Sequence, residues 1–137
     1  MRLKNKVALI TGGSTGIGKA ITEIFVKEGA KVTIADINKV QGRKTAKENK
    51  CLFVFCDISN ENHVEIALNN TISSYGKIDI LVNCAANLGG PNNVVNITTK
   101  EWRDVLSVSL DGVFYCSKYI MPELIKAGNG SIINISS

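Results

Sequence analysis

A cluster of glycines near the N-terminus has the residue types and the spacing that bind phosphate groups. Gly12, Gly16 and Gly18 stand in the segment TGGSTGIG, which joins an apolar run to a stretch with helical periodicity. Glycine lets the backbone turn sharply and approach a ligand closely, because it has no Cβ atom. The first N–H groups of a helix have no partner within the helix and attract anions. The segment therefore predicts a binding site for the pyrophosphate of a nucleotide.

A carboxylate follows the next apolar run and could bind the sugar of the same ligand. Asp36 closes the segment KVTIAD, 18 residues after Gly18. In a doubly wound dinucleotide-binding fold, an acidic residue about 20 positions beyond the glycine loop accepts hydrogen bonds from the adenosine ribose. Aspartate is also a common turn residue at the end of a strand. Taken together with the glycine loop, Asp36 favours the ribose-binding interpretation.

A second interpretation of the glycine loop is a nucleoside-triphosphate site. The residues from Gly13 to Lys19 match the first seven positions of the pattern GxxxxGK[ST], in which the lysine reaches the terminal phosphates. The eighth position is Ala20, which has no hydroxyl for a magnesium ion. Lysine is also an ordinary solvated residue in the first turn of a helix. We therefore favour dinucleotide binding over a P-loop nucleotide-binding protein, which remains the alternative.

These residues need a parallel α/β framework to come together. Five apolar runs alternate with helical patterns, which favours right-handed crossovers and a parallel sheet covered on both faces. The fold class predicted is therefore doubly wound α/β, in one domain, with ligands bound at the carboxyl ends of the strands. The predicted strands are 6–11, 31–36, 52–56, 78–83 and 131–135, and the predicted helices are 16–28, 39–48, 60–74 and 99–127.

The segment after the fourth predicted strand is irregular and then becomes helical. The loop 88–96 is rich in glycine, proline and asparagine, and we expect it on the substrate side of the site. Thr98 or Thr99, together with Glu101, is expected to cap the long helix that follows. Gly112 and Pro122 are candidate bends within that helix.

Composition excludes several other classes of protein. A chain of 137 residues that is 45% hydrophobic fits one domain with a real core. Its 16 basic and 12 acidic residues are dispersed, so neither a nucleic-acid nor a membrane surface is indicated. No apolar run approaches the roughly 20 residues of a membrane span. The four cysteines lack any zinc-binding spacing, so we expect no metal site and free thiols in a reducing, cytoplasmic setting.

The order of the motifs resembles the short-chain dehydrogenase/reductase family along the whole chain. The glycine loop has that family's TGxxxGxG spacing, and Cys56-Asp57-Ile58 is similar to its adenine-contacting segment. Asn83-Cys84-Ala85-Ala86 resembles the family's NNAG segment, and Gly130 to Ser137 resembles the fifth strand that ends in the catalytic serine. The resemblance implies a Rossmann-like fold and hydride transfer between NAD(H) and a small alcohol or carbonyl substrate.

The resemblance also implies a role for each matching residue. The carboxylate of Asp36 would bind the ribose and would favour NAD(H) over NADP(H), because it repels a 2′-phosphate. Ser137 would donate a hydrogen bond to the reacting oxygen of the substrate. The implied cofactor contacts are those of Gly12, Gly16, Ile17 and Gly18 with the pyrophosphate, of Asp57 and Ile58 with the adenine, and of Asn83 and Ala85 along the cofactor toward the nicotinamide.

The sequence departs from the family pattern within two of these motifs. Cys84 and Ala86 replace the asparagine and glycine of NNAG, and both are small enough to keep the backbone path. Ser109 stands where the family has an asparagine of its proton relay. The serine side chain is shorter, so we expect it to need a water molecule to span the gap.

The third departure concerns the family's general acid/base, which is a tyrosine followed by a lysine four residues later. The residues four positions after Tyr75, Tyr115 and Tyr119 are aspartate, tyrosine and glutamate. We therefore expect an N-terminal portion of such an enzyme, truncated after the fifth strand and inactive alone. A cofactor-binding remnant without turnover is the alternative. The helix 99–127 resembles the element through which these enzymes dimerise, so a homo-oligomer is expected.

Overall fold

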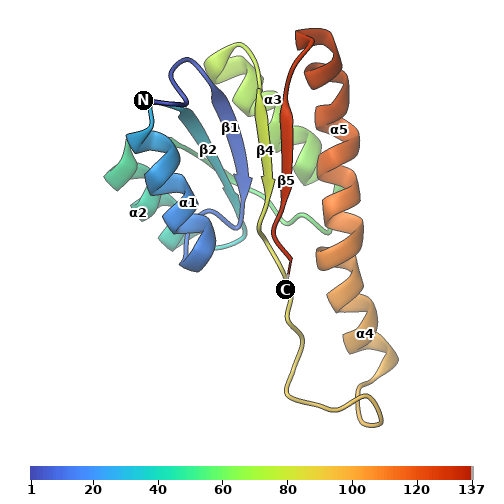
Figure 1. Cartoon of the computed structure of the whole chain (residues 1–137). Coiled ribbons are helices and arrows are strands. Elements are labelled where there is room, and N and C mark those ends of the chain that lie inside the picture. The colour runs from blue at the N-terminus through green and yellow to red at the C-terminus, as the bar shows by residue number, and fades with distance from the viewer. Residues whose placement is uncertain (137) are drawn as a thin grey trace.

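The computed structural model describes residues 1–136 as a parallel five-stranded sheet with helices on both faces (Figure 1). The doubly wound α/β class predicted from the sequence is confirmed. The strands are β1 (Val7–Thr11), β2 (Lys31–Asp36), β3 (Leu52–Phe55), β4 (Ile80–Asn83) and β5 (Ser131–Asn134). The helices are α1 (Gly16–Lys27), α2 (Lys39–Asn49), α3 (Glu61–Tyr75), α4 (Thr99–Leu106) and α5 (Gly112–Ala127), and the π-helical turn η1 (Ser107–Asp111) joins the last two.

The strand order places the first strand at the centre of the sheet. The order is β3-β2-β1-β4-β5, so the chain winds outward from β1 to β3 and then crosses to the other side. A doubly wound sheet opens a crevice at the carboxyl ends where this reversal occurs. The glycine loop follows β1 and the NNAG-like segment follows β4, so both predicted motifs lie at the reversal.

An apolar core on each face of the sheet holds the layers together. Helices α1 and α2 cover one face, and α3 and α5 cover the other (Figure 1). Ile10 and Ile34 belong to the first core, whereas Leu81 and Ile120 belong to the second, and all four are fully buried. Burying each such side chain stabilises the fold by about 1.5–3 kcal/mol relative to leaving it exposed. Among residues 1–136, none of the helices is both long enough and apolar enough to span a bilayer.

The predicted helix 99–127 is helical throughout, and the π-helical turn η1 within it separates α4 from α5. Thr98, one of the two residues predicted as the cap, is the N-cap of α4 and forms a capping box with Glu101. Gly112 begins α5 and lies close to the turn after β3. A Cβ atom at Gly112 would lie 2.7 Å from the Ile58 side chain. The helix then continues through Pro122.

Strand β4 begins at Ile80 rather than at the predicted residue 78, because the residue before it serves as a buried anchor. The carboxylate of Asp79 is 4% exposed and accepts a hydrogen bond from the backbone N–H of Val7 at 2.8 Å. Lys77 and Lys6 lie 2.9 and 3.8 Å from the same carboxylate. Asp79 therefore fixes the start of β4 against the start of β1.

We expect Asp79→Ala to lower the free energy of unfolding by about 2 kcal/mol, because the buried N–H of Val7 loses its acceptor. The two lysines are 39% and 47% exposed and add little to this loss. Asp104→Ala is the matched control, since that carboxylate is half exposed and pairs with Lys100 on the same helix. Chemical denaturation measures both variants, and equal losses would contradict the anchoring role.

Candidate functional site

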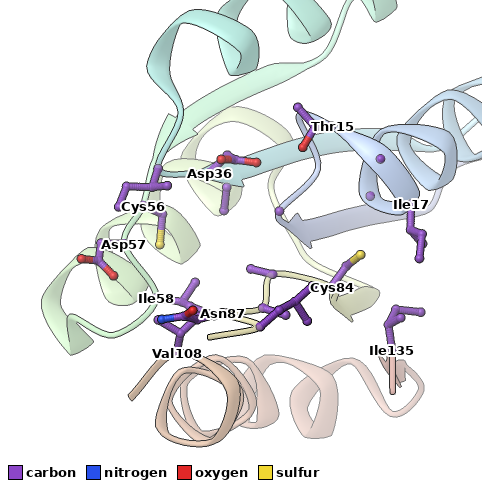
Figure 2. A pocket seen from close by; sticks show the side chains of 18 of the residues that line it. Thr15, Ile17, Asp36, Cys56, Asp57, Ile58, Cys84, Asn87, Val108 and Ile135 are labelled. Carbon is purple, nitrogen blue, oxygen red and sulfur yellow. The ribbon is translucent and has the colours of Figure 1, made fainter. Parts of the chain in front are cut away.

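A cleft of about 670 Å³ opens at the carboxyl ends of the strands (Figure 2). Its walls are the glycine loop, the end of β2, the turn after β3, the loop after β4, η1 and the segment after β5. The volume lies within the range of about 300–1,000 Å³ that is common for small-molecule sites. Eight of the residues predicted from the sequence line it together, namely Gly12, Gly16, Ile17, Gly18, Asp36, Asp57, Ile58 and Ala85.

Two glycines of the loop have distinct structural roles. A Cβ atom at Gly18 would lie 2.0 Å from the carbonyl oxygen of Gly12, so the close approach of α1 to the loop requires glycine there. Gly16 has a φ of +52°, and a Cβ atom there would meet no protein atom within 4 Å. Gly16 also lines the cleft.

The first turn of α1 presents backbone N–H groups to the cleft. Side chains cap the N-termini of α2, α3 and α4, whereas within residues 1–136 no side chain caps α1 at Thr15. The first turn of α1 also contains no acidic residue. Free N–H groups and the positive end of the helix dipole together attract a phosphate. This end of the cleft is therefore built to receive an anion.

Asp36 is held in place by hydrogen bonds on both carboxylate oxygens. Oδ2 accepts from the backbone N–H of Ser14 at 3.1 Å and from its hydroxyl, and Oδ1 accepts from the N–H of Asn38 at 2.9 Å. Asp36 and Asp57 are the only charged side chains among the described residues that line the cleft. The site therefore offers carboxylate acceptors for hydroxyl groups and no side-chain cation for a phosphate.

Lys19, which decides between the two interpretations of the glycine loop, lies outside the cleft lining. Its ammonium group is 3.7 Å from Glu23 and 3.6 Å from Glu48. These contacts are those of a surface lysine that bridges α1 and α2. The geometry therefore supports the dinucleotide interpretation, which predicts no phosphate contact for this side chain.

The turn after β3 is stabilised by a histidine that the sequence analysis did not single out. His63 on α3 accepts the backbone N–H of Asp57 at its Nδ1 atom, at 3.4 Å. The Asp57 carboxylate accepts from the N–H of Ser59 at 3.0 Å and from its hydroxyl at 2.6 Å. Ile58 is 4% exposed and packs beneath the cleft. The turn is thus fixed before any ligand arrives.

Two polar side chains organise the strand ends beneath the cleft. The hydroxyl oxygen of Thr11 accepts the backbone N–H groups of Cys84 and Ala85 at 3.0 and 3.1 Å, which sets the path of the NNAG-like segment. Sequence reasoning gave Thr11 no role, although a polar residue at the end of an apolar strand was a visible signal. The amide of Asn83 donates to Asn134 at 2.8 Å, and Asn83 does not line the cleft. Its predicted cofactor contact stays a prediction.

The cleft also contains two thiols, neither of which is activated. Burial, with the neighbouring charges of Asp57 and Asp36, raises the pKa of Cys56 to about 12. Burial also raises the pKa of Cys84 above its usual value. A neutral thiol is a poor nucleophile. Cys56 and Cys84 therefore contribute shape to the cleft rather than reactivity.

The two serines predicted to act in catalysis have different positions. Ser109 lies in η1, where its hydroxyl accepts the N–H of Asn87 and donates to the carbonyl oxygen of Asn87, both at 3.2 Å. The contact with the loop is direct, and Ser109 is not among the residues that line the cleft. Ser137 lies outside the described residues, whereas Ser136 lines the cleft.

Comparison with known proteins supports the family resemblance. A family model described as short chain dehydrogenase matches residues 6–137. The chain is 40% identical over 137 residues to mitochondrial borneol dehydrogenase from Lavandula x intermedia, and 38% identical over 141 residues to secoisolariciresinol dehydrogenase from Forsythia intermedia. The alignments cover 99% of this chain and 53% and 50% of those proteins. The chain thus spans about half the length of the curated relatives it matches.

The fold has a close counterpart among solved structures. The crystal structure of 3-ketoacyl-(acyl-carrier-protein) reductase from Brucella melitensis, complexed with NADH, superposes with a TM-score of 0.95 at 35% sequence identity. The match covers 98% of this chain and 58% of that one. The structural match and the family model each extend over almost the whole chain. The chain therefore belongs to the short-chain dehydrogenase family.

Proposed function

We propose that this chain binds NAD(H) in the cleft and forms the cofactor-binding part of an oxidoreductase. The reaction proposed is hydride transfer between the nicotinamide and the alcohol or carbonyl group of a small molecule. One observation carries this proposal: the carboxylate of Asp36 and the first turn of α1 line one cleft, which offers a ribose acceptor and a phosphate site together. The NADH bound by the structural neighbour and the dehydrogenase activities named for two relatives support it.

The residues of the cleft fit this cofactor group by group. The open space at Gly16 and the N–H groups of α1 suit the pyrophosphate, and Asp36 suits the ribose hydroxyls. Asp57 and Ile58 form the part of the wall that would contact the adenine. When bound, the dinucleotide supplies the hydride donor or acceptor. The chain itself binds and orients it.

We expect NADH to bind at least about tenfold more tightly than NADPH, because Asp36 would lose a charge-assisted hydrogen bond and face a like charge. Asp36→Asn keeps the size of the side chain and removes its charge, so it should bind NADPH better than the wild type does. Asp36→Ala should bind NADH about tenfold more weakly. Fluorescence titration with both cofactors measures these affinities.

The control for these variants is Glu23→Ala, which removes a half-exposed carboxylate outside the cleft lining and should change neither affinity. If the wild type bound NADPH as tightly as NADH, and Asp36→Ala altered neither, the ribose assignment would be wrong.

A cofactor-binding protein without turnover is the second candidate function. It is favoured by the sequence observation that none of Tyr75, Tyr115 and Tyr119 is followed by a lysine four residues later. Within residues 1–136, no tyrosine or lysine lines the cleft. Under this hypothesis residues 1–137 bind the dinucleotide and do not reduce or oxidise a substrate.

We also propose that the protein forms a homo-oligomer through α4 and α5. Several large apolar side chains along these helices are exposed, among them Trp102 at 54%, Phe114 at 59% and Ile125 at 71%. Exposed apolar patches on a folded protein commonly mark contact surfaces.

A reducing compartment such as the cytoplasm is the setting we propose. The described structure holds all four cysteines as free thiols, and two of them, Cys56 and Cys116, are buried. Free thiols persist where disulfides are rare, as in the cytosol.

A further inference from the structure

The helical segment beside the cleft departs from regular α-helix where the loop after β4 meets it. In η1 the N–H of Gly112 donates to the carbonyl oxygen of Ser107, which is the i to i+5 pattern of a π-turn. Such turns are frequent at functional sites. Just before this turn, the carbonyl oxygen of Asp104 accepts the Ser107 hydroxyl at 2.9 Å and the side-chain amide of Asn87 at 3.3 Å.

Asn87 is engaged through all four of its polar groups. Its N–H and carbonyl oxygen both bind the Ser109 hydroxyl at 3.2 Å, as donor and acceptor respectively. Its side-chain oxygen accepts the N–H of Gly89 at 3.0 Å, and its side-chain nitrogen donates to Asp104. We call this set of contacts between Asn87, Ser109 and Asp104 the Asn87 latch. It joins the loop to the helices at two points.

The loop beyond the latch is packed closely against α4. Gly89 has a φ of +72°, and a Cβ atom there would lie 3.2 Å from a methyl group of Val105. Asn87, Leu88 and Val108 all line the cleft, and Figure 2 labels Asn87 and Val108 among its lining residues. The latch therefore fixes one wall of the cleft, to which both the loop after β4 and η1 contribute residues.

We propose that Ser109 acts as a positioning residue, which through Asn87 holds the loop after β4 as a wall of the cofactor cleft. The inference rests on the proposed function, because its consequence is measured as NADH affinity. Without the Ser109 hydroxyl, both backbone groups of Asn87 lose their partner. The loop must then be ordered when the cofactor binds, and that ordering reduces the affinity.

The test combines hydrogen exchange without ligand and NADH titration. In Ser109→Ala and in Asn87→Ala we expect faster exchange of the amides in residues 85–90, with α3 unchanged. We expect Ser109→Ala to bind NADH about 3- to 10-fold more weakly, as the loss of modest hydrogen bonds implies. Ser109→Thr keeps the hydroxyl and should restore both the exchange rate and the affinity.

Asn92→Ala is the matched control on the same loop, because the Asn92 side chain bonds to the exposed Glu101 and does not line the cleft. It should change neither measurement. Unchanged exchange in Ser109→Ala would overturn the latch, whether or not NADH binds. Faster exchange with unchanged NADH affinity would overturn the positioning role. A wild-type protein that binds no NADH would overturn the proposed function and, with it, the positioning role of Ser109. The hydrogen-exchange measurement would still show whether the latch holds the loop.

Discussion

Gly16→Val is expected to weaken NADH binding by at least about 100-fold, since two or more charge-assisted hydrogen bonds to the pyrophosphate would be lost. Gly16 lines the cleft and has open space around it, so we expect a valine side chain there to occupy volume that the phosphates need. Lys19→Ala should leave the affinity nearly unchanged, because that ammonium group pairs with Glu23 and Glu48 instead. Isothermal titration of both variants with NADH measures the difference.

The strain of a side chain at positive φ must be separated from the obstruction of the cleft. Gly76→Val provides that control, because Gly76 has a φ of +82° and equally open surroundings at the end of α3. It should lose stability to a similar degree and keep its NADH affinity. The P-loop hypothesis requires the reverse order of effects. Magnesium-dependent ATP binding that is lost in Lys19→Ala would therefore reject the dinucleotide interpretation.

The second expected result is that residues 1–137 alone show no turnover above background with NAD⁺ and simple secondary alcohols. General acid/base catalysis contributes about 10²–10⁴-fold and needs a group within hydrogen-bond reach of the reacting oxygen. The titratable side chains of the described cleft are two aspartates held by neighbours and two thiols with raised pKa values, Cys56 and Cys84. None of these supplies an activated proton donor.

The tyrosines of the described chain do not supply that group either. The hydroxyl of Tyr75 donates to the carbonyl oxygen of Val32 at 3.2 Å, and that of Tyr119 donates to Glu61 at 3.2 Å. Neither of these residues lines the cleft, and Tyr115 does not line it either. The measurement is NADH formation by absorbance, with cofactor titration on the same preparation to show that the site is formed. Turnover on the order of 1–10³ s⁻¹ would contradict the expectation and assign the acid/base role to another residue.

Much of the framework could be predicted from the sequence because its signals are local. Strands buried on both faces produce continuous apolar runs, and VALIT and KVTIAD each matched a strand to within a residue. Helix ends followed from caps and glycines, as at Gly76 and Thr98. The glycine loop and Asp36 were identified for the same reason, since their spacing along the chain carries the signal.

The η1 turn escaped prediction, because it changes the hydrogen-bond register of a helix without changing its apolar periodicity. Nothing in the segment SVSLD distinguishes a π-turn from an α-helix. The partner of Ser109 could not be predicted from the sequence either. The family resemblance implied a relay position for this residue, and the structure shows that its hydroxyl binds the backbone of Asn87, 22 positions away.

What the sequence by itself determined was the order of the elements and the places of the glycine loop and of the acidic residue that follows it. Only the tertiary structure decided which polar groups hold the site together. Thr11 meets Cys84 across 73 positions, and Asp79 meets Val7 across 72. A buried N–H group needs a hydrogen-bond acceptor. Strand order and packing decide which residue supplies that acceptor, and neighbours in the chain do not.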